Sequence, residues 1–246
     1  MNKLIVIFLF FTASVSVLGQ IETDRPDQTE ASSTVPINSF QMETGFVWEK
    51  TKNGDEKSFA GPSILLRYSI NKFIELRAFY QYEHFSMSKV NYTTDGLSDL
   101  ELGVKLQLFK KDSCKTEIAL LSHVVIPSAK NELSNQAIGN ISKLCVSHSL
   151  NDWLGIGYNL GYVYLEEQHS IVYSVALGFS VNNKIGCYLE PYGSYTEAGY
   201  FESNFDGGLT YLLKQNLQLD ASYGFGLNHS MNYFSLGFSW NFADVF

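Results

Sequence analysis

The sequence has little that could build a disulfide scaffold or a metal centre. It contains three cysteines, Cys114, Cys145 and Cys187, which are too few and too widely spaced for a disulfide framework. Their odd number leaves at least one of them unpaired. No Cys-x-x-Cys or His-x-x-x-His spacing occurs, so the common zinc-ligand patterns are absent. We therefore expect neither a metal nor a cofactor.

Basic residues are also scarce. The chain has 17 lysines and arginines against 25 aspartates and glutamates, with a formal net charge of −8. The basic residues are scattered along the sequence and form no cluster. A nucleic-acid-binding protein presents a basic patch or stripe, so we expect no nucleic-acid partner.

Long apolar runs are missing after the leader. No later segment has 18 consecutive apolar residues, so the sequence predicts no transmembrane helix. At the start, Lys3 precedes an apolar run, Leu4 to Phe11, and small residues lead to Gly19. This is the pattern of a secretory signal peptide, and the run is shorter than the roughly 20 residues of a membrane anchor. We place the signal peptide at 1–19 and expect the chain to be exported.

Aromatic residues and an alternating pattern are what the sequence does have. Aromatic side chains make up 15% of the chain. In residues 100–108, leucines and one valine alternate with polar residues and glycine, and a period of two predicts a β-strand. The same period recurs over segments of about 10–13 residues, which suits a tilted membrane crossing better than a soluble sandwich. Aromatic residues gather toward the segment ends, as in the interfacial girdles of membrane barrels.

These patterns predict an all-β fold, a transmembrane antiparallel β-barrel of about twelve strands in the outer membrane of a Gram-negative-type cell. Ten strands is the rival count, because three assignments are weak and Pro62 interrupts one of them. The expected strands are 40–50, 58–70, 73–84, 97–109, 116–127, 140–150, 153–165, 170–181, 185–196, 203–213, 217–227 and 232–242.

The connections between these strands alternate between longer loops and tight turns, as in bacterial outer-membrane barrels. An even strand number places both ends of the barrel on the short-turn, periplasmic side. The chain then divides into the signal peptide, a periplasmic segment at 20–39 and the barrel at 40–246. The terminal Phe246 resembles the C-terminal recognition signal of outer-membrane barrels, although Asp244 interrupts its pattern.

The stretch "TDRPDQTEASSTVPINSFQMETGF", residues 23–46, resembles the start of the family named after the MetA pathway of phenol degradation. Further matches are "GLSDLELGVKLQLF" at 96–109 and "NFDGGLTYLLKQNLQLD" at 204–220. Ser128-Ala129 departs from the Thr-Gly that this family often has. The resemblance implies an outer-membrane channel or transporter and a link to aromatic compounds. The residues themselves do not select a phenol.

The alternation assigns charged side chains to the barrel interior. Five of them lie on three successive strands and can form one cross-strand ladder. They are Arg67, Glu75, Arg77, Glu101 and Lys105. Such a ladder can brace the lumen, or it can line a polar conduit whose acidic excess disfavours anions. The candidate lumen-lining and selectivity residues are Glu43, Arg67, Glu75, Arg77, Asp99, Glu101, Lys105, Glu190, Asp206 and Asp220.

The polar segment before the first strand has two interpretations. It can be a solvated, disordered tail, or Asp24, Arg25 and Asp27 can fold back into the barrel mouth as a plug. Arg25 could then bind a lumen carboxylate such as Glu43. If these ion pairs are exposed, each contributes about 0–1 kcal/mol, so we expect a modest hold and exchange between docked and released states.

We therefore predict a porin-like channel for passive passage of small solutes, with membrane lipid and a small molecule as its partners. The alternatives are a structural or adhesive barrel and, less favoured, a lipid-hydrolysing enzyme. Ser122-His123 and Ser147-His148 are adjacent pairs, but neighbours in a strand point to opposite faces. No nucleophile-elbow motif, Gly-x-Ser-x-Gly, occurs, so we expect no enzyme. The sequence indicates no oligomeric state.

Overall fold

The computed structural model describes residues 21–111 and 114–242. The predicted signal peptide with its cleavage site and the terminal Phe246 lie outside the described residues. Within these residues, no helix has the length and apolar composition needed to cross a membrane. The one helical element there is a short 3₁₀ turn, η1 (Lys52–Gly54).

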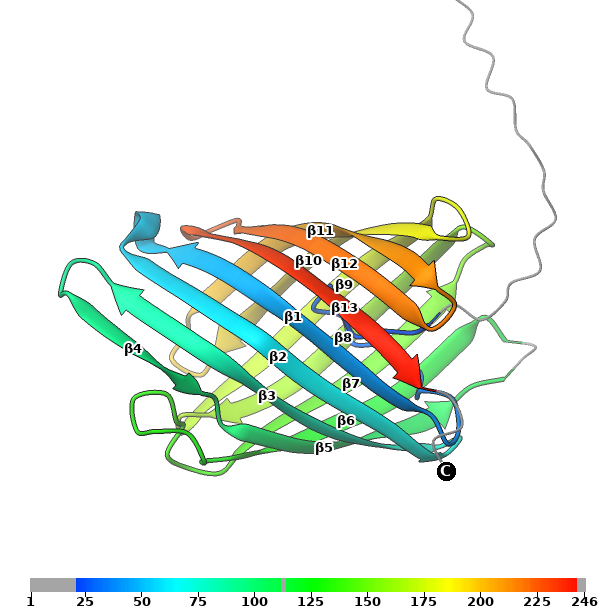
Figure 1. Ribbon diagram of the computed structural model, residues 1–246, viewed down its shortest axis with the longest axis horizontal. Coiled ribbons are helices and arrows are strands. Elements are labelled where there is room, and N and C mark those ends of the chain that lie inside the picture. Colours follow the sequence, from blue (N-terminus) through cyan, green and yellow to red (C-terminus); the bar gives the residue numbers. More distant parts are fainter. Residues whose placement is uncertain (1–20, 112–113, 243–246) are drawn as a thin grey trace, which may run out of the picture.

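Thirteen strands in the described part of the chain form one antiparallel sheet. The sheet closes into a barrel because β1 pairs with both β2 and β13, and β2 pairs in turn with β3 (Figure 1). The strands are β1 (Phe40–Thr51), β2 (Glu56–Asn71), β3 (Ile74–Met87), β4 (Tyr92–Leu97), β5 (Leu100–Phe109), β6 (Thr116–Ile126), β7 (Gly139–Ser149), β8 (Leu154–Leu165), β9 (Gln168–Ser180), β10 (Ile185–Thr196), β11 (Phe201–Lys214), β12 (Leu217–Gly226) and β13 (Met231–Phe242).

The barrel wall has twelve strand positions, called here staves. There are twelve because β4 and β5 both pair with β3 and together occupy one stave. The predicted count of twelve is confirmed, and the rival count of ten is wrong. The single strand expected at 97–109 is interrupted at Ser98 and Asp99. There the amide of Gln81 donates to the Ser98 side-chain oxygen (3.0 Å) instead of to a main-chain carbonyl, which breaks the ladder locally.

Proline does not end the second strand. β2 runs through Pro62, and its register against both neighbours shifts at this point. A β-bulge places the residue that lacks an amide hydrogen outside the regular ladder. The strand is therefore continuous. Across the bulge, however, the side chains that face inward switch between odd-numbered and even-numbered positions.

Asparagine side chains shape three of the short turns. Asn71, Asn151 and Asn182 each accept two main-chain amide hydrogen bonds from residues two and three positions later, at 2.8–3.1 Å. This local bonding is the Asx-turn, which satisfies the amides of a tight reversal. These turns share one end of the barrel, called here the short-turn end. The other end carries the longest connection, residues 127–138, and is called the long-loop end.

The two faces of the barrel wall have opposite chemistry. Leu102 and Leu219 face outward with 46% and 41% of their surface exposed, whereas Lys105 is fully buried inside. Asp220 and Ser235 are also buried on the inner face. An apolar exterior around a polar interior is the arrangement that a lipid environment requires. Exposed aromatic side chains gather at both ends, namely Phe73, Trp153 and Trp240 at the short-turn end and Trp48, Tyr200 and Phe201 at the long-loop end.

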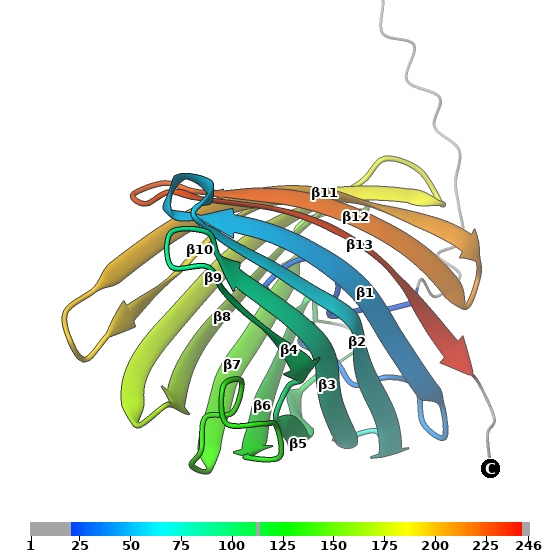
Figure 2. The same cartoon turned by 60° about the vertical axis from the view of Figure 1, so that its left-hand side comes forward.

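Residues 21–39, called here the N-terminal segment, precede β1 and have no regular secondary structure. Figure 2 shows this segment, in blue, running inside the barrel. Its buried residues include Asp24, Thr29, Ser33 and Val35. The interior of the barrel is therefore filled partly by its own N-terminal segment.

Candidate functional site

The centre of the barrel interior is a charge cluster built around Asp24 of the N-terminal segment. Its carboxylate accepts a hydrogen bond from Arg77 Nη1 at 2.6 Å and from Lys105 Nζ at 3.0 Å. Arg67 Nη1 lies 3.3 Å from Asp24 Oδ2. The side chains of these four residues are at most 4% exposed. One carboxylate from the segment thus meets three cations from β2, β3 and β5.

Two wall carboxylates complete the cluster. Arg67 binds Glu43 at 2.8 Å and Glu75 at 2.9 Å. Both carboxylates also hold the main chain of the segment, because Glu43 accepts from the Asp24 amide and Glu75 from the Val35 amide. The predicted cross-strand ladder therefore serves as the binding surface for residues 24–35.

Arg25 binds a different carboxylate from the one we expected. Its Nη2 donates to Asp220 Oδ1 at 3.0 Å and to the Ser235 hydroxyl at 2.8 Å. Glu43 receives the Arg25 main-chain amide instead, so the expected side-chain pair between Arg25 and Glu43 is wrong. The reason is steric: Gly45 and Gly237 face each other across β1 and β13, and a Cβ on either would overlap the Arg25 guanidinium. The two glycines leave a flat slot that directs this side chain toward β12.

The far side of the segment is held mainly by β8, β9 and β10. Glu190 accepts from the Gln28 amide at 2.7 Å and from the Thr29 hydroxyl at 2.5 Å. Asn159 accepts from the Glu30 amide at 2.6 Å. These contacts lie on the opposite side of the barrel from β2 and β3, so the segment crosses the interior from wall to wall.

The ion pairs of the segment are more deeply buried than the sequence suggested. We expected exposed ion pairs with a modest hold, but the pairs around Asp24 are almost fully buried. Removing one partner of a buried pair costs far more than removing one of an exposed pair, because the remaining charge stays desolvated. The sequence could not show this, since burial depends on the barrel that surrounds the segment.

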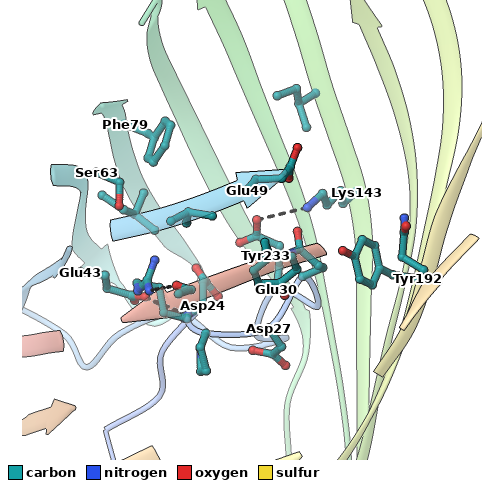
Figure 3. Close-up of a pocket in the computed structure, with 18 of the residues that line it drawn as sticks. Asp24, Asp27, Glu30, Glu43, Glu49, Ser63, Phe79, Lys143, Tyr192 and Tyr233 are labelled. Carbon is teal, nitrogen blue, oxygen red and sulfur yellow. Dashed lines mark hydrogen bonds and ion pairs between the residues drawn. The ribbon is translucent and has the colours of Figure 1, made fainter. Parts of the chain in front are cut away.

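A large cavity lies between the segment and the long-loop end. Its volume is about 980 Å³. Figure 3 shows Asp24, Asp27 and Glu30 on its segment side, with Phe79 and Tyr192 on its walls. Two smaller pockets of about 360 and 250 Å³ lie at the short-turn end. The segment therefore stands between a wide vestibule and the opposite end of the barrel.

One edge of the N-terminal segment borders both the large cavity and a pocket at the short-turn end. Asp27 and Glu30 line the large cavity and also the pocket of about 250 Å³. On the adjacent wall, the Tyr233 hydroxyl donates to Asp206, and Glu190 and Asp206 face each other across β10 and β11. This side of the lumen is acidic, whereas the β2, β3 and β5 side carries the cations.

Asp99 is placed differently from the other predicted lumen residues. At the break between β4 and β5, its carboxylate accepts hydrogen bonds from the amides of Ser128, Ala129 and Asn135 at 2.8–2.9 Å. It also accepts from the Ser134 hydroxyl. The expectation that Asp99 lines the lumen is therefore wrong, because the interruption of the stave turns this carboxylate to the loop at 127–138.

This loop contact predicts a pH effect at the long-loop end. Burial alone would raise the pKa of Asp99, but hydrogen bonds from the Ala129, Asn135 and Ser128 amides outweigh it and hold that pKa below its ordinary value. A depressed folded-state pKa gives stability that is present above the unfolded value and is lost as pH falls through the folded one. We expect amide protection of the 127–138 loop to be high at neutral pH and to fall in acid below that value.

Hydrogen exchange with correction for intrinsic rates measures this protection. Asp99→Asn should lower protection at neutral pH to about the level that the wild type shows in acid and so remove its pH dependence, because an amide accepts fewer and weaker hydrogen bonds than a carboxylate. Asp152→Asn, at an exposed turn, is the matched control and should change nothing in the loop. Unchanged protection in Asp99→Asn would contradict the assignment.

Glu101 is the last of the predicted lumen residues to be placed. Glu101 binds His123 at 2.7 Å, and Arg77 Nε donates to the other nitrogen of that ring, so Glu101 joins the cluster through a histidine. Glu30, Gln107 and Asn159 were not predicted as site residues, although Gln107 Nε2 donates to the Ser32 carbonyl. The alternating pattern places Gln107 and Asn159 on the inner face of the wall. Their hydrogen-bond partners lie in the N-terminal segment, which has no alternating pattern.

The adjacent Ser–His pairs split between the two faces of the wall. His123 points into the lumen, while Ser122 bonds Ser142 on the other face. Ser147 meets Ser32 of the segment inside, while His148 contacts Tyr158 outside. Neither pair forms a serine–histidine couple. In residues 21–111 and 114–242, no group of acidic, histidine or cysteine side chains is arranged to hold a metal ion.

Solved structures with the same fold include an outer-membrane channel and two porins. The COG4313 outer membrane channel from Pseudomonas putida F1 superimposes with a TM-score of 0.69 at 11% identity, over 86% of this chain and 98% of that one. The KdgM porin in complex with disordered oligogalacturonate matches with a TM-score of 0.58 at 10% identity, over 82% of this chain and 99% of that one. The NanC porin gives 0.58 at 10% identity, over 81% and 98%.

At these identities the likeness establishes the fold. No curated protein matches this chain in sequence. The model of one protein family, described as "Putative MetA-pathway of phenol degradation", matches residues 23–242, which is most of the chain. The chain therefore belongs to this family of outer-membrane β-barrels.

Proposed function

We propose that this protein is an outer-membrane channel for passive passage of small solutes, with its N-terminal segment acting as a plug. The long-loop end then faces outward and the short-turn end faces the periplasm, because bacterial barrels have short periplasmic turns and longer extracellular loops. The observation that carries the proposal is the cavity of about 980 Å³ that reaches the segment from the long-loop end. A barrel whose interior served only to brace its wall would have no use for a vestibule of this size.

Hydrophobic or aromatic compounds are the solutes that the cavity suits best. Six apolar side chains of the wall line it, namely Val47, Leu65, Phe79, Leu121, Ile141 and Met231. The name of the family links it to phenol degradation. Apolar side chains in an otherwise polar lumen give a small aromatic ring a surface to contact, and weak contacts of this kind permit release.

Planar-bilayer recording tests the proposal. We expect the purified mature protein to insert and give discrete conductance steps, with flicker from partial movements of the segment. A protein that inserts, runs as a folded barrel and stays non-conducting, both intact and without residues 20–36, would contradict the channel function. It would favour the structural or adhesive barrel.

A further inference from the structure

We infer that the floor of the vestibule is a binding site for the carboxylate of an amphipathic solute, now occupied by Glu30 of the protein's own segment. This inference rests on the proposed channel function and narrows its solute class to small organic acids with an apolar body. Figure 3 shows the Glu30 side chain meeting Lys143 at the wall of the cavity.

The geometry of Glu30 carries the first step. Its Oε2 accepts from Arg77 Nη2 at 3.0 Å, and its Oε1 lies 3.3 Å from Lys143 Nζ. One carboxylate thus spans two cations with one oxygen on each. The two cations come from β3 and β7, so the barrel wall sets their spacing and not the segment. A carboxylate from another molecule would find the same two donors in the same place.

The exposure of these groups carries the second step. The side chains of Glu30 and Lys143 are 19% and 20% exposed, whereas Asp24 is 4% exposed and Lys105 is fully buried. Glu30, Arg77 and Lys143 all line the large cavity. A solute in the vestibule can therefore reach the Glu30 pair and displace its carboxylate while Asp24 keeps the segment anchored below.

Apolar side chains beside the cations carry the third step. Phe79 is the next inward residue after Arg77 on β3, and Ile141 is the inward neighbour of Lys143 on β7. Leu121 pairs directly with Lys143 across β6 and β7. All three line the cavity. A solute whose carboxylate takes the place of Glu30 would lay its apolar body against this wall.

The acidic excess of the interior does not remove the site. Glu43 and Glu75 are paired with Arg67, and Glu101 is paired with His123. When Glu30 leaves, Lys143 loses its carboxylate and Arg77 loses one of three. The floor then gains positive charge where the solute binds. The acidic mouth, with Glu49 and Glu202, keeps the affinity weak, as a channel requires.

Calorimetry on the detergent-purified full-length mature protein tests the inference, with benzoate as the probe. We expect weak benzoate binding, and no binding of benzamide, which has the same ring without charge, or of acetate, which has the charge without the ring. Glu30→Gln removes the tethered competitor and should tighten benzoate binding about tenfold, because the free site is then populated more of the time. Lys143→Met should abolish it.

A matched control and a second readout keep the outcomes separate. Lys57→Met makes the same change at an exposed lysine of β2 and should leave benzoate binding unchanged. Equal binding of benzoate and benzamide, or weaker binding in Glu30→Gln, would overturn the site while leaving the channel function intact. Absence of conductance with retained benzoate binding would overturn the channel function and leave the site standing.

Discussion

Deletion of residues 20–36 is expected to raise single-channel conductance about threefold, because the conducting cross-section is then set by the wall and not by the segment. The segment lies across the lumen between β2 and β3 on one side and β8 to β10 on the other. It separates the large cavity from the pockets at the short-turn end. Removing it joins these spaces. Planar-bilayer recording of the variant beside the intact mature protein gives the measurement.

Point substitutions that weaken the docking should act in the same direction by a smaller amount. Arg25→Ala removes the bonds to Asp220 and Ser235, and Gly45→Ala puts a methyl group where the guanidinium now lies. Both should increase the open fraction and the noise. Gly178→Ala is the matched control, because a Cβ there meets nothing within 4 Å.

Salt should change the open fraction little. The ion pairs around Asp24 are buried, and buried pairs are screened much less than exposed ones. If deletion left conductance and noise unchanged in a folded, inserted barrel, the segment would not obstruct the path. The acidic composition of the segment would then need another explanation, such as a periplasmic partner.

Asp24→Asn is expected to undock the segment, at a cost of about 3–5 kcal/mol, since breaking a buried pair leaves uncompensated charge behind. The loss is large because one carboxylate serves Arg67, Arg77 and Lys105 together. We expect a more conducting channel and a lower temperature for the heat-induced mobility shift of the folded barrel. Asp152→Asn, at an exposed turn, should match the wild type in both measurements.

A double substitution separates the charge effect from a general loss of packing. Lys105→Met removes one of the cations that Asp24 neutralises. In the Asp24→Asn background it should restore part of the lost stability, because neighbouring groups in one network are coupled. Additive losses in the double variant would show that the two residues act independently, and the cluster would then not be the anchor of the segment.

The alternating pattern by itself determined the barrel and its two faces. A period of two leaves one face of each strand apolar and the other polar, and a lipid-facing barrel is the arrangement that satisfies every main-chain group with this pattern. Strand lengths near those of a membrane crossing then gave about twelve staves. Only at Ser98 did the stave boundary depend on a contact that no pattern shows, since a side-chain oxygen there replaces a main-chain carbonyl.

The partners inside the barrel were decided by the tertiary structure. The alternating pattern placed Arg67, Arg77 and Lys105 in the lumen. It did not predict that they share one carboxylate, because Asp24 lies 43 to 81 positions away from them in the sequence. The N-terminal segment has no period, so its sequence carries no information about which wall each residue meets. Closure of β1 on β13 creates the glycine slot that directs Arg25. Burial of the segment by the closed wall makes these ion pairs costly to break, because a charge that loses its partner there stays desolvated.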